Sequence, residues 1–498
     1  MQIKAFLVAS LTALVLAGCQ TTGTSSGGAP ATLSQRSSSD QRIGDENHPK
    51  ILAQFGGAYQ NPRVTGYVNQ IGRDLAAVSE QPQAKWTFTV LDTPTINAFA
   101  LPGGYVYVTR GLMALADDEA ELAGVIGHEI GHVTAGHSSL RQDRGQVAGL
   151  GLLLGAVGLS VLGVDPLASR GLLQLGQAAA GGVLASYSRS DELDADNLGI
   201  RYLARAGYDP VAQAEFLESM GSAAALESRI AGRSYNPNSV DFFASHPANA
   251  PRTRQAIRVA RNQGLVVREG AARNQDRFFS MIDGMSYGDS ASQGFVDGRT
   301  FSHPELRFTY TVPRGFTITN SSQQVGARGP QGSLFIMEGG QDTGGDLVRF
   351  IGERWVPSLS EQARVGRFRE LDATRINGLE AAYGIIPIQT RGRTSDALLV
   401  AIRMDGTIYR LTGIAPQGSG LIAPMEQAAR TFRRLSRGEA NGLRGQKIDI
   451  VTVRRGETVS SLAGRMNVSD FKEERFRVLN DLRPGEQLRA GQKVKLIR

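Results

Sequence analysis

The chain has 498 residues, of which 41% are hydrophobic and 20% are charged, and it contains a single cysteine. A lone cysteine excludes a fold held by internal disulfides, so hydrophobic cores and any bound metal must hold the chain together. The formal net charge is +7, and the segment from Arg437 onward has 14 Lys and Arg against 8 Asp and Glu, which makes the tail the basic part of the chain.

The N-terminus has the features of a secretion signal. Lys4 precedes an apolar run that ends in Leu16-Ala17-Gly18-Cys19. These last four residues resemble a bacterial lipobox, which predicts removal of the signal peptide (residues 1–18) and lipidation of Cys19; an ordinary signal peptide with an incidental cysteine is the alternative. Gln20 follows Cys19 where aspartate would retain a lipoprotein at the inner membrane. By that analogy we expect a lipid-anchored, periplasm-facing protein of the bacterial cell envelope, at the outer membrane.

Residues 19–42 are rich in Ser, Thr, Gly and Gln and predict a flexible linker between the lipid and the first domain. An exported chain does not meet nucleic acid, so we expect no nucleic-acid partner despite the basic tail. That tail favours anionic cell wall or lipid, and an ordinary solvated surface explains it equally well.

Residues 97–111 predict two short strands around a turn. Asn97, Ala98, Phe99 and Ala100 precede a Pro-Gly-Gly sequence, and Tyr and Val then alternate over residues 105–108.

The most informative motif follows, His128-Glu129-Ile130-Gly131-His132. Good helix-capping aspartates at positions 117 and 118 and apolar residues at helical spacing predict that it lies inside a helix. Histidines four residues apart on a helix face the same way and can hold one metal ion, with Glu129 placed beside it as a base. A catalytic zinc needs a third protein ligand, so the sequence predicts one downstream.

Residues 188–196 predict the start of a second helix, which Gly207 and Pro210 end. Its Glu192 and Asp196 lie four residues apart, so one can face a metal while the other accepts a hydrogen bond from a histidine ring. We expect Glu192 to be the third zinc ligand and Asp196 to be the partner of a ligand histidine, His128 in preference to His132.

The two helices resemble those of gluzincin peptidases related to the CAAX prenyl protease and to Oma-type mitochondrial proteases. The residues from Asn97 to Gly111, and Ser-His-Pro at positions 245–247, resemble the bacterial envelope members, typified by the β-barrel-assembly-enhancing protease. This resemblance covers about residues 43–254. It implies one Zn²⁺ per chain and polypeptide substrates, with the strand at Asn97, Ala98, Phe99 and Ala100 as the edge on which substrate lies. Such an edge selects unfolded segments more than particular side chains.

His246 lies in the Ser-His-Pro motif that the family shares. By resemblance it faces the zinc, either as a catalytic group that stabilises the oxyanion or as a fourth ligand in a latent state. A structural histidine before Pro247 is the third reading. The other histidines suggest less: we expect His137 to face solvent at the helix end, and His303, in a second Ser-His-Pro, to lie in a loop.

Zinc at this site is predicted to lower the pKa of a bound water to about 7, with Glu129 taking the proton as general base and returning it to the leaving amine. Residues 147–164 form an apolar stretch of about the minimum length of a membrane span, but five glycines interrupt it. Packed helices or an amphipathic hairpin are preferred there.

Beyond residue 300, short alternating segments separated by Pro and Gly predict an α+β domain on a mainly antiparallel sheet, with helices near residues 346–359 and 422–435. From Val451 to Leu496 the tail resembles a LysM module, a βααβ fold that binds peptidoglycan sugars. Glu457 and Val459 depart from its usual pattern, which puts sugar binding in more doubt than the fold.

The predicted fold class is therefore multidomain α+β. It comprises a mainly helical HExxH zinc peptidase domain with a small edge-strand sheet (43–265), a linker (266–300), an α+β domain of unknown role on an antiparallel sheet (301–437), and a small LysM-like βααβ module (447–498). The predicted function is a zinc metalloendopeptidase that hydrolyses misfolded or misassembled envelope proteins. The alternatives are a chaperone-like assembly factor for outer-membrane proteins that cleaves rarely, and a scaffold anchored to peptidoglycan through its tail.

Overall fold

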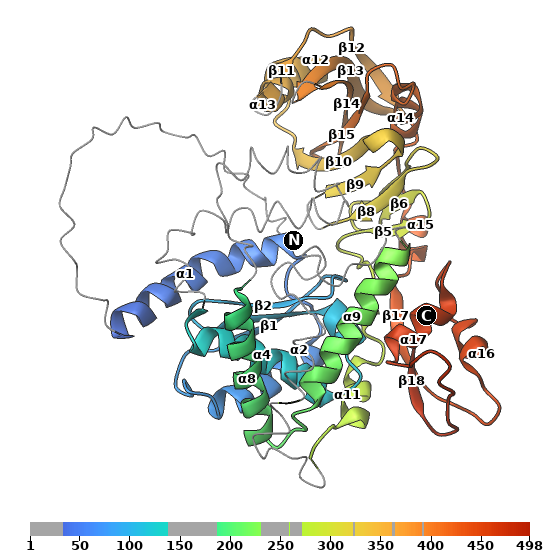
Figure 1. Cartoon of the computed structure of the whole chain (residues 1–498). Coiled ribbons are helices and arrows are strands. Elements are labelled where there is room, and N and C mark those ends of the chain that lie inside the picture. The colour runs from blue at the N-terminus through green and yellow to red at the C-terminus, as the bar shows by residue number, and fades with distance from the viewer. Residues whose placement is uncertain are drawn as a thin grey trace, which may run out of the picture.

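The computed structural model describes residues 33–137, 187–230, 258, 271–321, 324–360, 364–390 and 393–498. Its residues form a helical part with a small sheet, a strand-rich domain, and a C-terminal module that lies against the helical part (Figure 1). The predicted α+β class with antiparallel sheets is confirmed. None of the described helices is both long and apolar enough to cross a bilayer, and the apolar stretch at 147–164 lies outside the described residues.

The helical part is built around a three-stranded sheet in the order β1-β3-β2, in which β1 and β3 are parallel and β2 and β3 antiparallel. Alternation along β3 gives it two buried faces: Val106 and Val108 face the main helical core, whereas Tyr105 and Tyr107 face α1. The elements are α1 (Leu33–Gln54), α2 (Pro62–Ala77), β1 (Thr87–Leu91), β2 (Ala98–Leu101), β3 (Tyr105–Thr109), α3 (Arg110–Leu115), α4 (Glu119–Thr134), α8 (Arg189–Arg205), α9 (Ala212–Ile230) and α11 (Gln275–Ile282).

The N-terminal end of α1 differs from the expectation for residues 19–42. We predicted a flexible linker there, but residues 33–42 are helical and continuous with the rest of α1. A polar composition does not exclude a helix here, because contacts farther along stabilise it: Ile51 and Phe55 are buried against the sheet. Exposed pairs four residues apart, such as Arg42 with Glu46 at 3.0 Å, add modest support to the helix.

The predicted linker at 266–300 is also wrong for its described part, residues 271–300. Phe278, Phe279 and Ile282 of α11 are buried in the same core as the peptidase helices. After them, β4 (Ser286–Tyr287) pairs with the tail strand β17 (Gln446–Thr452), and β5 (Phe295–Asp297) pairs with β6 (Thr300–His303). The apolar spacing of α11 gives it one buried face, so this segment packs with the domains on either side instead of spanning a gap between them.

The strand-rich domain has an antiparallel eight-stranded sheet in the order β11-β13-β14-β15-β10-β9-β8, with β12 beside β13, and a four-stranded sheet β16-β7-β6-β5. Ile351 and Trp355 pack on one face of the long strands and Met425 on the other. The elements are β7 (Phe308–Thr311), β8 (Thr317–Asn320), β9 (Gln324–Arg328), a 3-10 turn (Pro330–Gly332), β10 (Leu334–Gln341), α12 (Leu347–Arg349), a π-helical turn (Phe350–Trp355), α13 (Val356–Ser360), β11 (Arg364–Val365), β12 (Glu370–Ile376), β13 (Leu379–Thr390), β14 (Arg393–Met404), β15 (Thr407–Pro416), α14 (Ile422–Ala429), β16 (Arg433–Arg434) and α15 (Arg437–Gly442).

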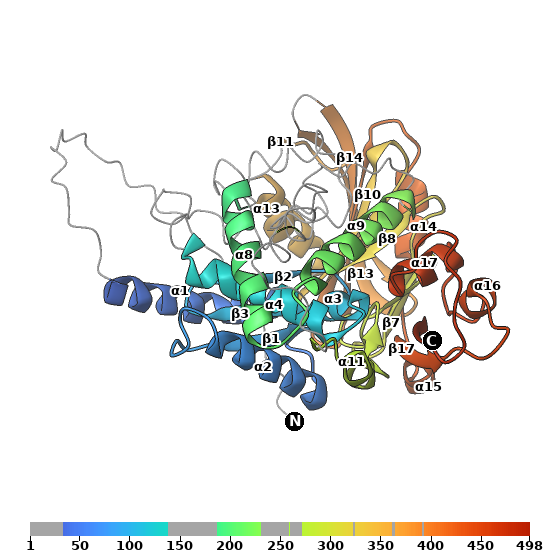
Figure 2. The ribbon, with the colours of Figure 1, turned by 60° about the horizontal axis from the view of Figure 1, so that its bottom comes forward.

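The tail has a β-α-α-β order of elements: β17, α16 (Val459–Ala463), α17 (Lys472–Leu479) and β18 (Lys493–Ile497), with β17 and β18 antiparallel. It is not packed as a separate body. Its apolar residues, among them Leu462, Phe476 and Leu496, belong to the same buried cluster as α2 and α4. Figures 1 and 2 both show α17 lying alongside α9.

Candidate metal centre

Two crossing helices bring the predicted ligands together. His128 and His132 lie one turn apart on α4, and Glu192 lies in the first turn of α8. Asp118 starts α4 by accepting a hydrogen bond from Glu121 N at 2.9 Å. Ser188 and Asp191 start α8 with a capping box, in which each side chain accepts from the other residue's backbone N–H. The polar residues that begin the two helices therefore fix where the ligand-bearing turns fall.

The three ligand groups have a spacing that fits one zinc ion. Their nearest atoms are His128 Nε2 and His132 Nε2 at 3.0 Å, His132 Nε2 and Glu192 Oε1 at 3.4 Å, and His128 Nε2 and Glu192 Oε2 at 3.7 Å. Two ligand atoms bound to a tetrahedral zinc lie about 3.3 Å apart. All three side chains are buried. Two histidines and one glutamate also form a donor set that catalytic zinc uses, with one position left for water or substrate.

Asp196 holds the ring of His128, the histidine that the sequence favoured as its partner. Its Oδ1 lies 2.9 Å from His128 Nδ1, on the opposite side of the ring from the ligand nitrogen. The same Oδ1 accepts a hydrogen bond from Gln213 Nε2 at 2.9 Å. Gln213 belongs to α9, and nothing in its local sequence marked it as part of the site. A carboxylate bound in this way orients the ring and makes the ligand nitrogen more basic.

Glycines let α4 and α8 approach closely enough for this geometry. A Cβ added at Gly199 of α8 would lie 2.9 Å from the backbone nitrogen of His128, and one at Gly131 of α4 would lie 3.0 Å from the carbonyl oxygen of Ala195. At Gly127 the added atom would just touch Gly199. A larger residue at Gly199 or Gly131 would therefore push the helices apart and separate the histidines from Glu192.

The N-terminal end of α4 is anchored by buried hydrogen bonds. Glu119 is fully buried and accepts from Tyr67 Oη at 2.8 Å, Tyr208 Oη at 2.9 Å and Asn274 Nδ2 at 2.8 Å. Burial is the main cause of the raised pKa of Tyr67, followed by its hydrogen bond to Glu119. The helix that carries the motif is thus tied to α2, to the loop after α8 and to the segment before α11.

Glu129 follows His128 on α4, and its side chain is 1% exposed. Because it is buried and adjoins His128 in the sequence, its carboxylate is shielded from bulk water.

The predicted substrate strand lies at the end of the sheet. Asn97 immediately precedes β2, and Ala98, Phe99 and Ala100 lie within it. Among the described strands β2 pairs only with β3. Thr109 N donates to Asn97 O at 3.1 Å, so the alternation of an antiparallel ladder turns the backbone N–H and C=O groups of Ala98 and Ala100 away from β3. Ala98, Phe99 and Ala100 are only 5–8% exposed as whole residues, so the edge that faces away from β3 is itself largely covered.

His137 is not where we expected it. We predicted a solvent-facing residue, but its side chain is 6% exposed and its Nδ1 lies 3.0 Å from Nδ1 of His132. Gly136, with φ of 71°, turns the chain after α4 ends, which returns His137 to the helix. Burial lowers the pKa of His137. The ring of Tyr187 stacks on His132 with centroids 3.7 Å apart. The glycine after the helix was the one available signal.

Two predicted site residues, Cys19 and His246, lie outside the described residues. His303 is described, and it ends strand β6 instead of lying in a loop.

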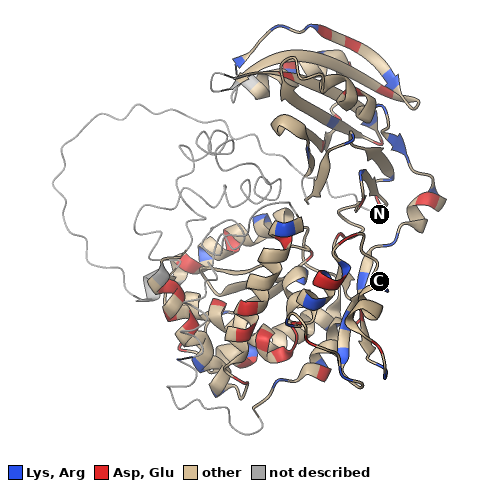
Figure 3. Ribbon diagram, turned by 45° about the vertical axis from the view of Figure 1, so that its right-hand side comes forward, with Lys and Arg blue, Asp and Glu red and all other residues tan. Residues whose placement is uncertain are grey.

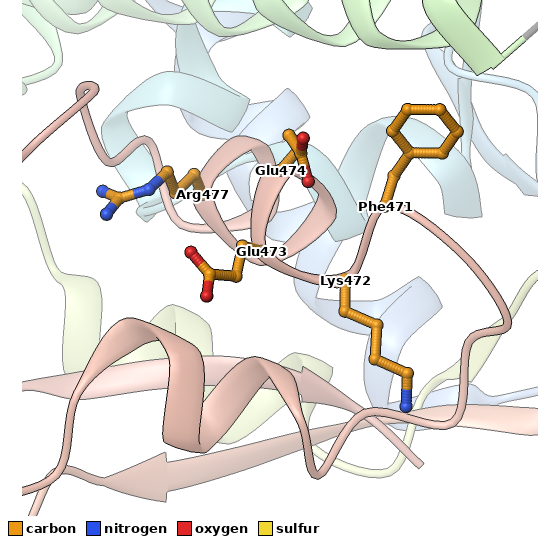
Figure 4. A pocket seen from close by; sticks show the side chains of 5 residues that line it. All are labelled: Phe471, Lys472, Glu473, Glu474 and Arg477. Carbon is orange, nitrogen blue, oxygen red and sulfur yellow. The ribbon is translucent and has the colours of Figure 1, made fainter.

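A pocket of about 620 Å³ lies on the C-terminal module, lined by Phe471, Lys472, Glu473, Glu474 and Arg477. These side chains spread in different directions from Phe471 and α17, and the mixed charges do not converge on one point (Figure 4). Glu474 forms an ion pair with Arg229 of α9 at 3.7 Å. The metal ligands are absent from the lining of this pocket.

Residues 62–259 match the model described as Peptidase family M48. The matched segment contains α4 and α8 with the three ligand residues, so the fold, the site and the match agree on one class: this part of the chain is similar to the M48 peptidases, in line with its motifs.

Known relatives of the chain agree with this class. The β-barrel assembly-enhancing protease of Escherichia coli (strain K12) is 30% identical over 227 residues, which are 44% of this chain and 42% of that protein. The mitochondrial metalloendopeptidase OMA1 of Schizosaccharomyces pombe is 28% identical over 43% of this chain and 59% of that protein. The chain therefore spans less than two thirds of either relative. The Ran-binding protein Mog1p of Saccharomyces cerevisiae aligns with 29% of this chain and 98% of its own at 10% identity, with a TM-score of 0.24 that is too low to assign a fold.

Proposed function

We propose that this chain is a zinc-dependent metalloendopeptidase of the bacterial cell envelope that hydrolyses misfolded or misassembled envelope proteins. The observation that carries the proposal is the convergence of His128, His132 and Glu192 to within 3.0–3.7 Å of one another. Glu129, the next residue after His128 on α4, is buried. The match to an M48 family model supports the peptidase class.

His128, His132 and Glu192 would hold the zinc, and Asp196 would keep the His128 ring in the orientation that binding needs. When bound, zinc polarises the substrate carbonyl and makes a water more acidic. Glu129 would accept a proton from that water at its carboxylate and return it to the leaving nitrogen, which is general acid–base catalysis by one group. The buried setting excludes bulk water from the proton transfer.

Substrate would bind as an extended strand along β2. The N–H and C=O groups of Ala98 and Ala100 that face away from β3 would donate to and accept from the backbone of any unfolded segment that reaches this largely covered edge. Such a site selects for unfolded chain, which suits misassembled proteins. The envelope location rests on the lipobox-like Cys19, and the role of His246 as oxyanion group or fourth ligand stays a prediction.

The second candidate is a chaperone-like assembly factor that holds clients on the same edge and cleaves rarely. The edge of β2 that no described strand pairs with would serve this role as well, since binding along the edge does not require cleavage. Binding of the tail to peptidoglycan also stays a prediction, and a pull-down of the full chain with purified cell wall tests it.

Glu129→Gln decides between the two. We expect it to keep one zinc per chain, because the three ligands are unchanged, and to lose cleavage of an unfolded substrate such as casein by about 10²–10⁴-fold, because the proton acceptor is gone. The measurements are metal analysis and casein cleavage, with His132→Ala as the variant that should lose zinc.

Cleavage by Glu129→Gln at the wild-type rate would show that another group is the base, and wild type without zinc would remove the proposal. Loss of cleavage with all cellular effects retained would favour the holding role.

A further inference from the structure

His137 and Asp194 form a second line of contacts that ends on a metal ligand. His137 Nδ1 lies 3.0 Å from Nδ1 of His132, and its Nε2 lies 3.4 Å from Oδ2 of Asp194 on α8. Asp191 is farther from the same nitrogen, at 4.0 Å. His137 is buried, whereas Asp194 has 59% of its side chain exposed.

One arrangement of protons satisfies all of these contacts. Nε2 of His132 faces the other two ligands, so a metal-bound His132 carries its proton on Nδ1. That N–H can donate to Nδ1 of His137, which leaves the His137 proton on Nε2, where it can donate to Asp194. Each of the two rings therefore has one tautomer that fits these contacts.

We propose that His137 is a positioning residue for the zinc ligand His132, held in place by Asp194. The relay matches the direct contact of Asp196 with His128, at 2.9 Å, so α8 orients both ligand histidines as well as supplying Glu192. Tyr187 covers the face of the His132 ring and His137 holds its edge, and together they restrict ring rotation. Partners of this kind contribute about 10- to 100-fold to metal affinity.

The inference rests on the zinc site of the proposed function, and zinc affinity of the full chain tests it without reference to cleavage. His137→Phe keeps the ring volume and removes both nitrogens, so we expect zinc to bind about 10- to 100-fold more weakly in a chelator competition. His137→Gln keeps an acceptor and a donor and should recover part of the loss. Asp194→Asn should weaken binding by a smaller factor. His303→Phe, a buried histidine in the other domain, is the matched control and should bind zinc like wild type.

The absorption spectrum of the cobalt-substituted protein separates positioning from a merely structural role. A change in the His132 ligand should shift the cobalt bands of His137→Phe, whereas a general loss of stability would lower its melting temperature and leave the bands in place.

Unchanged zinc affinity and unchanged bands in folded His137→Phe would overturn the inference. If that variant does not fold, Asp194→Asn decides, because its side chain is largely exposed, and wild-type affinity there overturns the relay. Wild type without zinc would instead refute the proposed function.

Discussion

His303 stays neutral in the folded chain because of what surrounds it. His303 is the last residue of strand β6. Its ring packs between Phe301 and Phe308 and accepts a hydrogen bond from Leu306 N at 3.2 Å. Burial lowers the pKa of His303 from 6.5 to about 4. Charging the ring would place an unpaired cation in an apolar cluster and break the bond to Leu306. Although it lies in a second Ser-His-Pro motif, this histidine has a structural role.

The lowered pKa of His303 predicts a pH window for stability. In the unfolded chain the ring takes up a proton below about pH 6.5, whereas in the folded chain it does so only near pH 4. The neutral His303 ring therefore makes its full contribution to the free energy of unfolding above pH 6.5. This contribution, roughly 3 kcal/mol at most, is lost as the pH falls toward 4. His303→Gln cannot titrate, so the difference in unfolding free energy between wild type and variant should shrink over this window. Urea unfolding at several pH values measures it, and parallel curves would contradict the prediction.

At the scale of elements, the site depends on how closely α4 and α8 can cross. The histidines project from α4 and Glu192 from α8, so a small change in helix separation changes every ligand distance. Gly199 sets this separation from α8, since an added Cβ would meet both the backbone of His128 and Oε1 of Gln213, the latter at 2.7 Å. A backbone atom cannot move aside as a flexible side chain can.

Gly199→Ala should therefore weaken zinc binding roughly tenfold and lower stability by about 1–3 kcal/mol, because the helices must separate. Gly66 on α2 is the matched control, since an added Cβ there has nothing within 4 Å. Gly66→Ala should leave zinc binding unchanged and raise stability by up to about 1 kcal/mol through helix propensity. Chelator competition and thermal unfolding measure both. Equal zinc affinities for the two variants would show that the crossing tolerates the extra atom.

At the scale of the whole molecule, a buried lysine of the C-terminal strand binds to the end of α3 and the segment between α3 and α4. Lys495 of β18 is fully buried, and its Nζ donates to the carbonyl oxygens of Ala114, Leu115 and Ala116 at 3.1, 3.0 and 2.7 Å. It also forms an ion pair with Asp117 at 3.0 Å. Burial raises the pKa of Asp117 to about 6, although Lys495 opposes the rise. The tail thus caps the carbonyl groups at the C-terminal end of α3, just before α4 begins.

Lys495→Met should destabilise the peptidase part itself, by about 3 kcal/mol or more, since it leaves Asp117 and three carbonyl groups buried without their partner. Lys493 of the same strand is the matched control: it pairs with Asp276 at the surface, so Lys493→Met should change little. Unfolding in urea compares them. A tail that folds as an independent module would instead give the two variants the same unfolding curve for the peptidase part.

The charge pattern follows this arrangement. Asp and Glu recur along the peptidase helices, and Lys and Arg along the basic tail packed beside them (Figure 3). Part of the tail's positive charge is therefore used inside the molecule, as Lys493 with Asp276 and Lys495 with Asp117 show. This leaves less of it for an anionic partner than the net charge suggests.

Residues close together in the chain could be assigned from the sequence. His128 and His132 face the same way because a helix repeats every 3.6 residues, and the same spacing separates Glu192 from Asp196. Capping residues marked where both helices begin, and alternation predicted a strand over residues 105–108, where the structure has β3 (Tyr105–Thr109). These features depend on local backbone geometry, and with the resemblance to gluzincin peptidases they were enough to indicate the peptidase class and the ligand set.

Only the tertiary structure decided the contacts between distant segments. Gln213 reaches Asp196 from another helix, His137 turns back onto His132, α11 joins the core instead of a linker, and Lys495 meets α3 across almost 400 residues. Each of these contacts depends on which buried faces pack together, and local periodicity does not specify the partner of a buried face. The polar group that completes a buried site comes from whichever element the packing places there.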